Sequence, residues 1–123
     1  MAVRPPADFD AAFGALKELL ARHQRSLVVA RDQPGDFLLV TRKDFRGQPM
    51  CFGGVTIRKN YVSFHLMPVY VEPKLLEGIS PGLRKRMQGK SCFNFKRVEE
   101  ELFAELRGLA KDGLDHFRKV DLA

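Results

Sequence analysis

Two segments in which polar and apolar residues alternate carry the side chains that could supply a nucleophile and its base. His65 lies on the polar side of residues 61–66, and Cys92 and Asn94 lie on the polar side of residues 91–95. If these segments are neighbouring strands, a thiol and an imidazole share one surface, as nucleophilic catalysis requires. The alternation does not fix the adjacency, so we name no catalytic residue and expect either a plain outer sheet face or a ligand-binding surface. The candidate ligand-binding residues are Arg58, Tyr61, His65, Cys92 and Asn94.

A second candidate surface is basic. Residues 79–98 contain six bases and no acid. Such a window attracts phosphate, nucleic acid or an acidic protein, or it is simply a solvated edge that keeps the domain soluble. Its last part interleaves bases with Phe93 and Phe95, as single-strand binders do, although both phenylalanines also alternate as core residues would. The candidate anion or nucleic-acid contacts are Arg84, Lys85, Arg86, Lys90, Lys96 and Arg97.

Other site chemistries lack their required spacing. Gly89-Lys90-Ser91 ends like a phosphate-binding loop, but the first glycine of that motif would fall at Arg84, and a strand follows instead of a helix. The three histidines are scattered, and Cys51 and Cys92 form neither a CxxC nor a Cys/His pair. We therefore predict no metal site, no cofactor and no disulfide.

The net charge of +6 is unevenly distributed. Residues 98–123 hold seven acids and four bases, a net −3, so residues 1–97 carry +9. The acids at 99–101 and at Glu105 suit the start of a helix, where carboxylates favour the positive end of the helix dipole. The basic window is the part of the charge that the expected elements leave unexplained.

Apolar periodicity predicts the elements that position these surfaces. Residues 8–23 and 98–117 repeat apolar side chains every three or four positions, as amphipathic helices do, and Asp8 suits the N-cap of the first. Residues 26–31 and 37–42 flank Pro34-Gly35, a turn signal that predicts a hairpin. A loop over 43–49 and a strand over 50–58 follow.

The next hairpin has a specified register. A two-residue loop at Lys59-Asn60 sets Ile57 opposite Val62, Thr56 opposite Ser63 and Val55 opposite Phe64, so every pair matches in polarity. The preceding pair of glycines at 53 and 54 predicts a bulge or a close backbone approach.

The remaining segments complete an α+β domain. Residues 74–79 and 83–88 are predicted as short helices, the second with Ser80 as N-cap and Pro81 in its first position, and residues 91–95 as a strand. Strands joined by short turns make an antiparallel sheet. We therefore expect one domain over residues 1–123, with about five antiparallel strands and the N- and C-terminal helices on one face.

The chain also lacks signals for membranes and secretion. Its longest aliphatic runs are far shorter than the roughly 20 residues of a membrane helix. The first ten residues contain no apolar core of a signal peptide, and two isolated thiols suit a reducing compartment. We expect a cytoplasmic protein with no membrane partner.

Residues 52–95 resemble the YdhG-like family of small bacterial domains, largely of unknown function. The resemblance rests on the hairpin at 53–66, on the Pro/Leu-rich segment after it, and on Gly89-Lys90-Ser91-Cys92-Phe93-Asn94-Phe95. It implies an intracellular α+β domain, and one branch of the family is described as frataxin-like iron chaperones. Residues 26–41 depart from the pattern because they lack its tryptophan-rich, glutamate-containing start. The first helix offers only Asp8, Asp10 and Glu18, so no iron ligand can be carried over.

These observations favour a non-enzymatic, cytoplasmic binding or interaction domain for an anionic ligand or surface, with an unknown partner. Three alternatives remain open: nucleic-acid binding through residues 84–97, a frataxin-like iron chaperone, and a small enzyme that uses Cys92 and His65.

Overall fold

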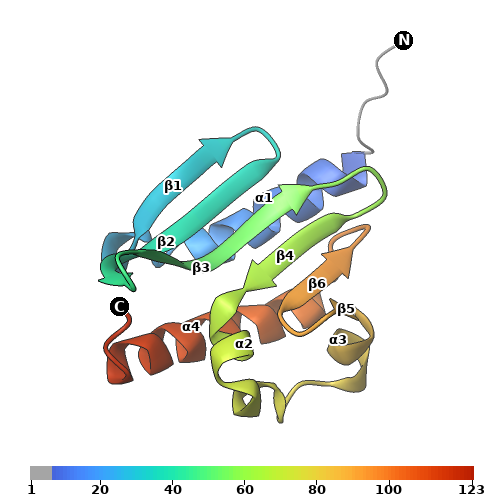
Figure 1. Cartoon of the computed structure of the whole chain (residues 1–123). Coiled ribbons are helices and arrows are strands. Elements are labelled where there is room, and N and C mark those ends of the chain that lie inside the picture. Colours follow the sequence, from blue (N-terminus) through green and yellow to red (C-terminus); the bar gives the residue numbers. More distant parts are fainter. Residues whose placement is uncertain (1–6) are drawn as a thin grey trace.

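A six-stranded antiparallel sheet organises the chain, and the computed structural model describes it over residues 7–123 (Figure 1). The strands lie in the order β1-β2-β3-β4-β6-β5. They are β1 (Val28–Gln33), β2 (Asp36–Phe45), β3 (Gln48–Ile57), β4 (Val62–Leu66), β5 (Met87–Gln88) and β6 (Cys92–Phe95). The first four are neighbours in sequence and in space, whereas β6 inserts between β4 and β5.

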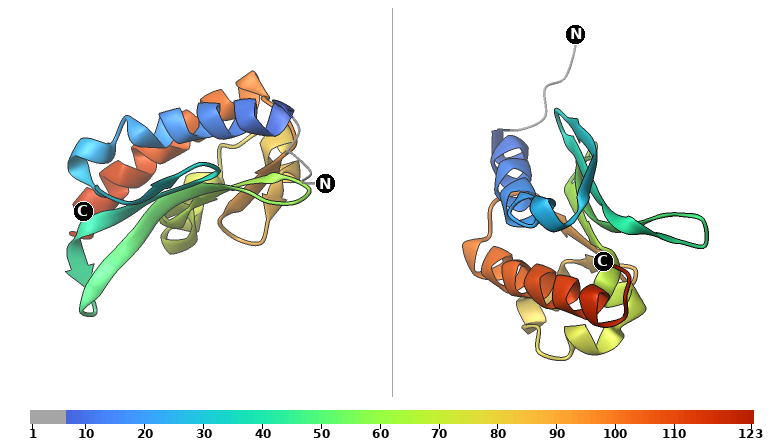
Figure 2. Two further views of the ribbon diagram at one scale, coloured as in Figure 1. Left: turned by 90° about the horizontal axis from the view of Figure 1, so that it is seen from above. Right: turned by 90° about the vertical axis from the view of Figure 1, so that its left-hand side faces the viewer.

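Both long helices cover the same face of the sheet, as predicted. Figure 2 shows α1 (Ala7–Ala21) and α4 (Glu100–Lys119) side by side above the strands. The shorter helical segments are η1 (Gln24–Ser26), α2 (Met67–Val71), η2 (Pro73–Leu76) and α3 (Pro81–Lys85). No helix within residues 7–123 is both long and apolar enough to cross a bilayer. Within residues 7–123 the opposite face of the sheet carries no long helix, and the candidate residues His65, Cys92 and Asn94 lie on that face.

Phenylalanines fill the space between the sheet and the helices. Phe95 on β6 meets Phe103 on α4 edge to face, with ring centroids 4.8 Å apart. Phe52 on β3 meets Phe117 near the other end of α4 in the same geometry, at 5.7 Å. Edge-to-face rings are a favourable arrangement within a close-packed core. Two such contacts hold α4 along its length and fix where its first residues lie.

The predicted hairpin register is confirmed. Ile57 pairs with Val62, Thr56 with Ser63 and Val55 with Phe64. The register between β2 and β3 shifts beside the two glycines, which marks a bulge. A Cβ at Gly53 would lie 3.1 Å from the carbonyl oxygen of His65, and one at Gly54 would lie 3.0 Å from that of Phe37. The glycines therefore allow both a bulge and a close backbone approach.

The strands extend further than the sequence predicted. Residues 43–49 were expected to form a loop, but only Arg46 and Gly47 separate β2 from β3. Both residues have positive φ, 55° and 88°, so a tight turn replaces the loop. The helix expected over 83–88 is also wrong in its second half, because Met87 and Gln88 form β5 and pair with Phe93 and Cys92. Backbone pairing with β6 outweighs the local helical tendency and adds a sixth strand.

Two smaller differences concern helices. Asp8 is not the N-cap of α1, which begins at Ala7; its carboxylate lies in the first turn, where it still favours the helix dipole. Residues 67–71, for which the sequence predicted no helix or strand, make α2, with Pro68 near its start. The segment expected as a helix over 74–79 is the shorter 3-10 turn η2. The whole connection from β4 to β6 spans 25 residues, 67–91.

Candidate functional site

A cleft of about 600 Å³ lies where β4, β6 and β5 meet the start of α4. We call it the basic cleft. It is lined by Tyr61, Lys85, Arg86, Met87, Gln88, Asn94, Lys96, Arg97 and Glu99. Four of these side chains are cationic and one is anionic, so the lining carries a net charge of +3. A concave surface of one sign concentrates its field and attracts ligands of the opposite sign.

Strand pairing explains why these residues converge. Ser63 pairs with Asn94, so the polar side of β4 continues into the polar side of β6. The backbone N–H of Asn94 donates to the carbonyl oxygen of Arg86 over 2.8 Å, which holds the end of α3 beside β6. Tyr61 directly precedes β4 and Lys96 directly follows β6. Because the two strands are antiparallel neighbours, both side chains reach the same surface.

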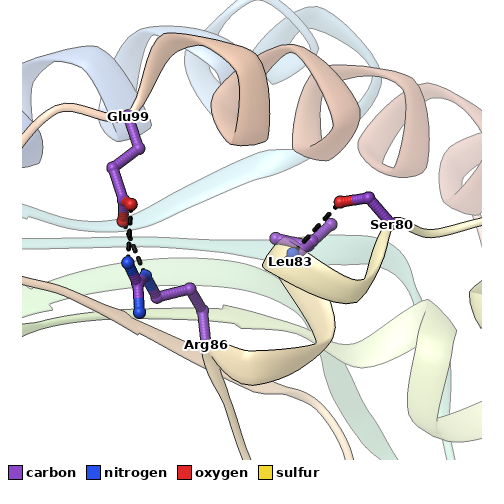
Figure 3. Close-up of polar contacts among 4 residues, drawn as sticks. All are labelled: Ser80, Leu83, Arg86 and Glu99. Carbon is purple, nitrogen blue, oxygen red and sulfur yellow. Dashed lines mark hydrogen bonds and ion pairs between the residues drawn. The ribbon is translucent and has the colours of Figure 1, made fainter.

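Arg86 and Glu99 form a bidentate ion pair in the lining of the cleft. Nε and Nη2 of Arg86 each donate to one carboxylate oxygen of Glu99, both over 2.7 Å (Figure 3). This side-by-side geometry is the strong form of the arginine–carboxylate pair. The hydrogen bonds from Arg86 lower the pKa of the Glu99 carboxyl, and they raise the pKa of Arg86 in turn. Glu99, the one acid of the cleft lining, is thus hydrogen-bonded to Arg86. Nη1 of Arg86 takes no part in this pair.

A partly buried cap holds α3, which ends at Lys85 and is followed by Arg86. Ser80 is the N-cap of α3, as predicted, and its Oγ accepts from the backbone N–H of Leu83 over 3.1 Å (Figure 3). The same hydroxyl donates to Glu105 on α4 over 2.6 Å, and the backbone N–H of Ser80 donates to the other carboxylate oxygen over 2.7 Å. Glu105 therefore fastens α3 to α4 and fixes the position of one cleft wall.

The other three cations of the cleft remain available. Lys85, Lys96 and Arg97 are exposed, and no ion pair within residues 7–123 involves them. Because they lie around one concavity, their charges add to one positive field, although Glu99 also attracts Arg97.

His65 and Cys92, whose adjacency the sequence left open, are neighbours in the structure, although both lie outside the lining of the cleft. They pair across β4 and β6, with Sγ of Cys92 3.3 Å from Nδ1 of His65. Oγ of Ser91 lies 3.2 Å from the same nitrogen. Burial lowers the pKa of His65, which favours the neutral imidazole that can accept a proton. Burial also raises the pKa of the Cys51 thiol to about 11, so Cys51 keeps its proton at neutral pH and is a poor nucleophile.

The structure divides the sequence-predicted residues. It brings Tyr61, Lys85, Arg86, Asn94, Lys96 and Arg97 into the cleft. Arg58 lies exposed in the turn after β3, and Lys90 lies exposed in the turn between β5 and β6. Arg84 donates to the backbone carbonyl of Leu76 over 3.1 Å, away from the cleft.

Three lining residues were missed by sequence reasoning. Met87 and Gln88 were assigned to a helix, so their place beside β6 was hidden. Glu99 was attributed to the helix dipole, but it precedes α4 and binds Arg86. Its position as the first acid after the basic window was the available signal.

Within residues 7–123 no group of three or more His, Cys, Asp or Glu side chains is placed to hold a metal ion. Glu18, one of the three acids on α1, is engaged by Arg22 at 2.7 Å. These observations give no support to an iron site, and we do not propose one.

Comparisons of the chain with protein-family models, curated proteins and solved structures found no match. The resemblance to the YdhG-like family stays a prediction, and the functional argument rests on the cleft.

Proposed function

We propose that this chain is a non-enzymatic binding domain that holds an anionic ligand in the basic cleft. The observation that carries the proposal is the gathering of three unpaired cations, Lys85, Lys96 and Arg97, around a concavity whose single acid is bound to Arg86. Cations spread over a convex surface would be solvated separately. Here they converge, so one anionic group can contact several of them.

Heparin affinity tests this proposal, because the heparin chain presents closely spaced negative charges. A triple variant with Lys85→Ala, Lys96→Ala and Arg97→Ala removes the free cations of the cleft. The matched control, Arg107→Ala, Lys111→Ala and Lys119→Ala, removes the same charge from exposed positions on α4.

The wild type is expected to bind at low salt and to elute as salt rises, since counterion release makes such binding salt-dependent. The cleft variant should elute at clearly lower salt, and the α4 variant close to the wild type. Equal elution of the two variants, or failure of the wild type to bind, would reject the proposal.

We also propose a cytoplasmic location. Both cysteines are free in the structure, as a reducing compartment requires. Acid quenching of intact cells, followed by denaturation and maleimide labelling without prior reduction, should modify both thiols if the location is correct. Recovery of an oxidised protein would contradict it.

The contact between His65 and Cys92 favours a second candidate, an enzyme in which His65 takes the thiol proton and Cys92 attacks an electrophile. Iodoacetamide provides a direct test, because sulfur forms the new carbon bond while iodide leaves and the proton passes to a base. Cys92 should then react faster than a simple thiol at pH 7, and His65→Gln should slow it. An ordinary rate that His65→Gln leaves unchanged would dismiss this candidate.

A further inference from the structure

The basic cleft combines groups that a simple anion does not require. Besides its cations it contains the aromatic ring of Tyr61 and the side-chain amides of Gln88 and Asn94. Amides offer both hydrogen-bond donors and acceptors, and an aromatic ring offers a flat apolar surface. A sulfate or a free phosphate can bind to cations and hydrogen-bond donors, but it makes no use of an aromatic ring.

We infer that the cleft takes one nucleotide unit of a single-stranded nucleic acid, with its phosphate on the cations and its base against Tyr61. This inference rests on the proposed function and names the ligand class for the same site. Bases in single strands stack on aromatic side chains and expose hydrogen-bonding edges to amides, while their phosphates contact Lys and Arg. The three kinds of group in the cleft match these three parts of a nucleotide.

The form of the site favours a single strand over a duplex. Bases within a duplex are stacked inside it and reach a protein pocket only when they are flipped out. A volume of about 600 Å³ lies in the range of small-ligand pockets and suits one unit of a flexible strand. The cations at 96 and 97 follow β6 directly, so a strand could continue past the cleft along the exposed end of the sheet.

Arg86 adds a fixed donor to this arrangement. Glu99 occupies Nε and Nη2, so the guanidinium is held in one orientation, while Nη1 and its two hydrogens lie outside the pair. Figure 3 shows that this free nitrogen is directed away from Glu99. Glu99 thus acts as a positioning residue for one phosphate contact, and the flexible Lys85, Lys96 and Arg97 supply the rest of the charge.

Fluorescence anisotropy with two labelled oligonucleotides separates the contribution of the base to binding from that of the phosphates. One is an oligothymidylate of about eight nucleotides, within the usual range of single-strand site sizes. The other is an abasic oligodeoxynucleotide of the same length and charge. The variant is Tyr61→Leu, with Tyr61→Phe to retain the ring. The other tyrosine of the chain, Tyr70, is exposed on α2 outside the cleft, so Tyr70→Leu is the matched control.

Tyr61→Leu should weaken oligothymidylate binding about 5- to 150-fold, the range found when a base loses its stacking partner. Binding of the abasic strand should not change, and Tyr61→Phe and Tyr70→Leu should leave both affinities near those of the wild type. Circular dichroism of each variant confirms that it is folded.

The possible results distinguish the two proposals. If the wild type binds both strands equally and Tyr61→Leu alters neither affinity, the nucleotide inference is wrong while the anion-binding proposal stands. Displacement of oligothymidylate by polyglutamate at equal charge concentration would identify an acidic protein as the occupant and also overturn the inference. If neither strand binds and heparin is not retained, both proposals fail.

Discussion

The two faces of strand β6 differ in almost every respect although their residues alternate along four positions. Phe93 and Phe95 face the helices and are 0% and 1% exposed. Cys92 and Asn94 face outward, half-buried beside other polar groups, and Asn94 lines the basic cleft. The inward side chains of this short strand therefore belong to the core, and one of its outward side chains belongs to the candidate site. Substitutions on the inner side should alter stability, and those on the outer side should alter binding.

The largest expected effect comes from the inner side of β6. Phe95→Ala removes a buried ring that contacts Phe103, so it should lower the free energy of unfolding by about 3–5 kcal/mol. Its neighbour Asn94→Ala should change stability by no more than about 0.5 kcal/mol, as is usual for outward-facing positions. Urea denaturation followed by circular dichroism measures both.

If Phe95→Ala does not fold, Phe95→Leu retains most of the buried volume and should show a smaller loss in the same direction. Similar losses for the variants at 94 and 95 would mean that the two faces do not divide stability from binding.

A smaller effect on stability is expected to distinguish the buried side of α4 from its exposed side. A Cβ at Gly113 would lie 2.7 Å from Cβ of Pro68 on α2, and both residues are buried. Overpacking costs about 1–3 kcal/mol and helix propensity returns about 1 kcal/mol, so we expect Gly113→Ala to lower stability by up to about 2 kcal/mol. Gly108 is exposed, and within the described chain a Cβ there meets nothing within 4 Å. Gly108→Ala should stabilise the domain by about 0.5–1 kcal/mol.

Thermal unfolding should therefore shift in opposite directions for these two alanine variants. An increase in Tm for both would show that α2 moves aside without cost and that the contact with α4 is loose.

The smallest effect is a pH-dependent one inside the cleft. Because Arg86 lowers the pKa of Glu99 in the folded protein, the pair stabilises the fold above the unfolded pKa of glutamate, about 4.3. That contribution is lost as pH falls through the lower, folded pKa. Glu99→Gln should thus reduce stability at pH 7 by at most about 1 kcal/mol, since both side chains are partly exposed.

Urea midpoints of the wild type and of Glu99→Gln should converge as the pH is lowered below 4. A difference that persists at acid pH would attribute the effect to packing and not to charge.

Where the pattern was local, the sequence predicted the structure well. The register of β3 and β4 follows from matched polarity across a two-residue loop, and Ser80 caps α3 as the Ser-Pro pair indicates. The shared surface of His65 and Cys92 was only conditional, because alternation shows which side a residue faces but not which strand lies beside it. The pairing of β4 with β6 supplied the missing step.

The errors arise where a distant partner decides the local structure. Met87 and Gln88 continue a helical pattern, yet β6 recruits them as an edge strand. Glu99 has the composition of a helix start, but its partner is Arg86, 13 positions earlier. Six of the nine cleft residues were nevertheless among the predicted candidates, because charge and outward parity are visible in sequence.

The insertion of β6 between β4 and β5 also bears on the order in which the molecule can assemble. Strands β1 to β4 follow one another through short turns, so each can pair as soon as its neighbour exists. Strand β6 must return across 25 residues, and closing such a long loop costs more entropy than closing a hairpin. We therefore expect the N-terminal strands to form before the cleft does. During synthesis, the edge of β4 would stay unpaired until the C-terminal third of the chain is made. We expect ligand binding to begin only after that.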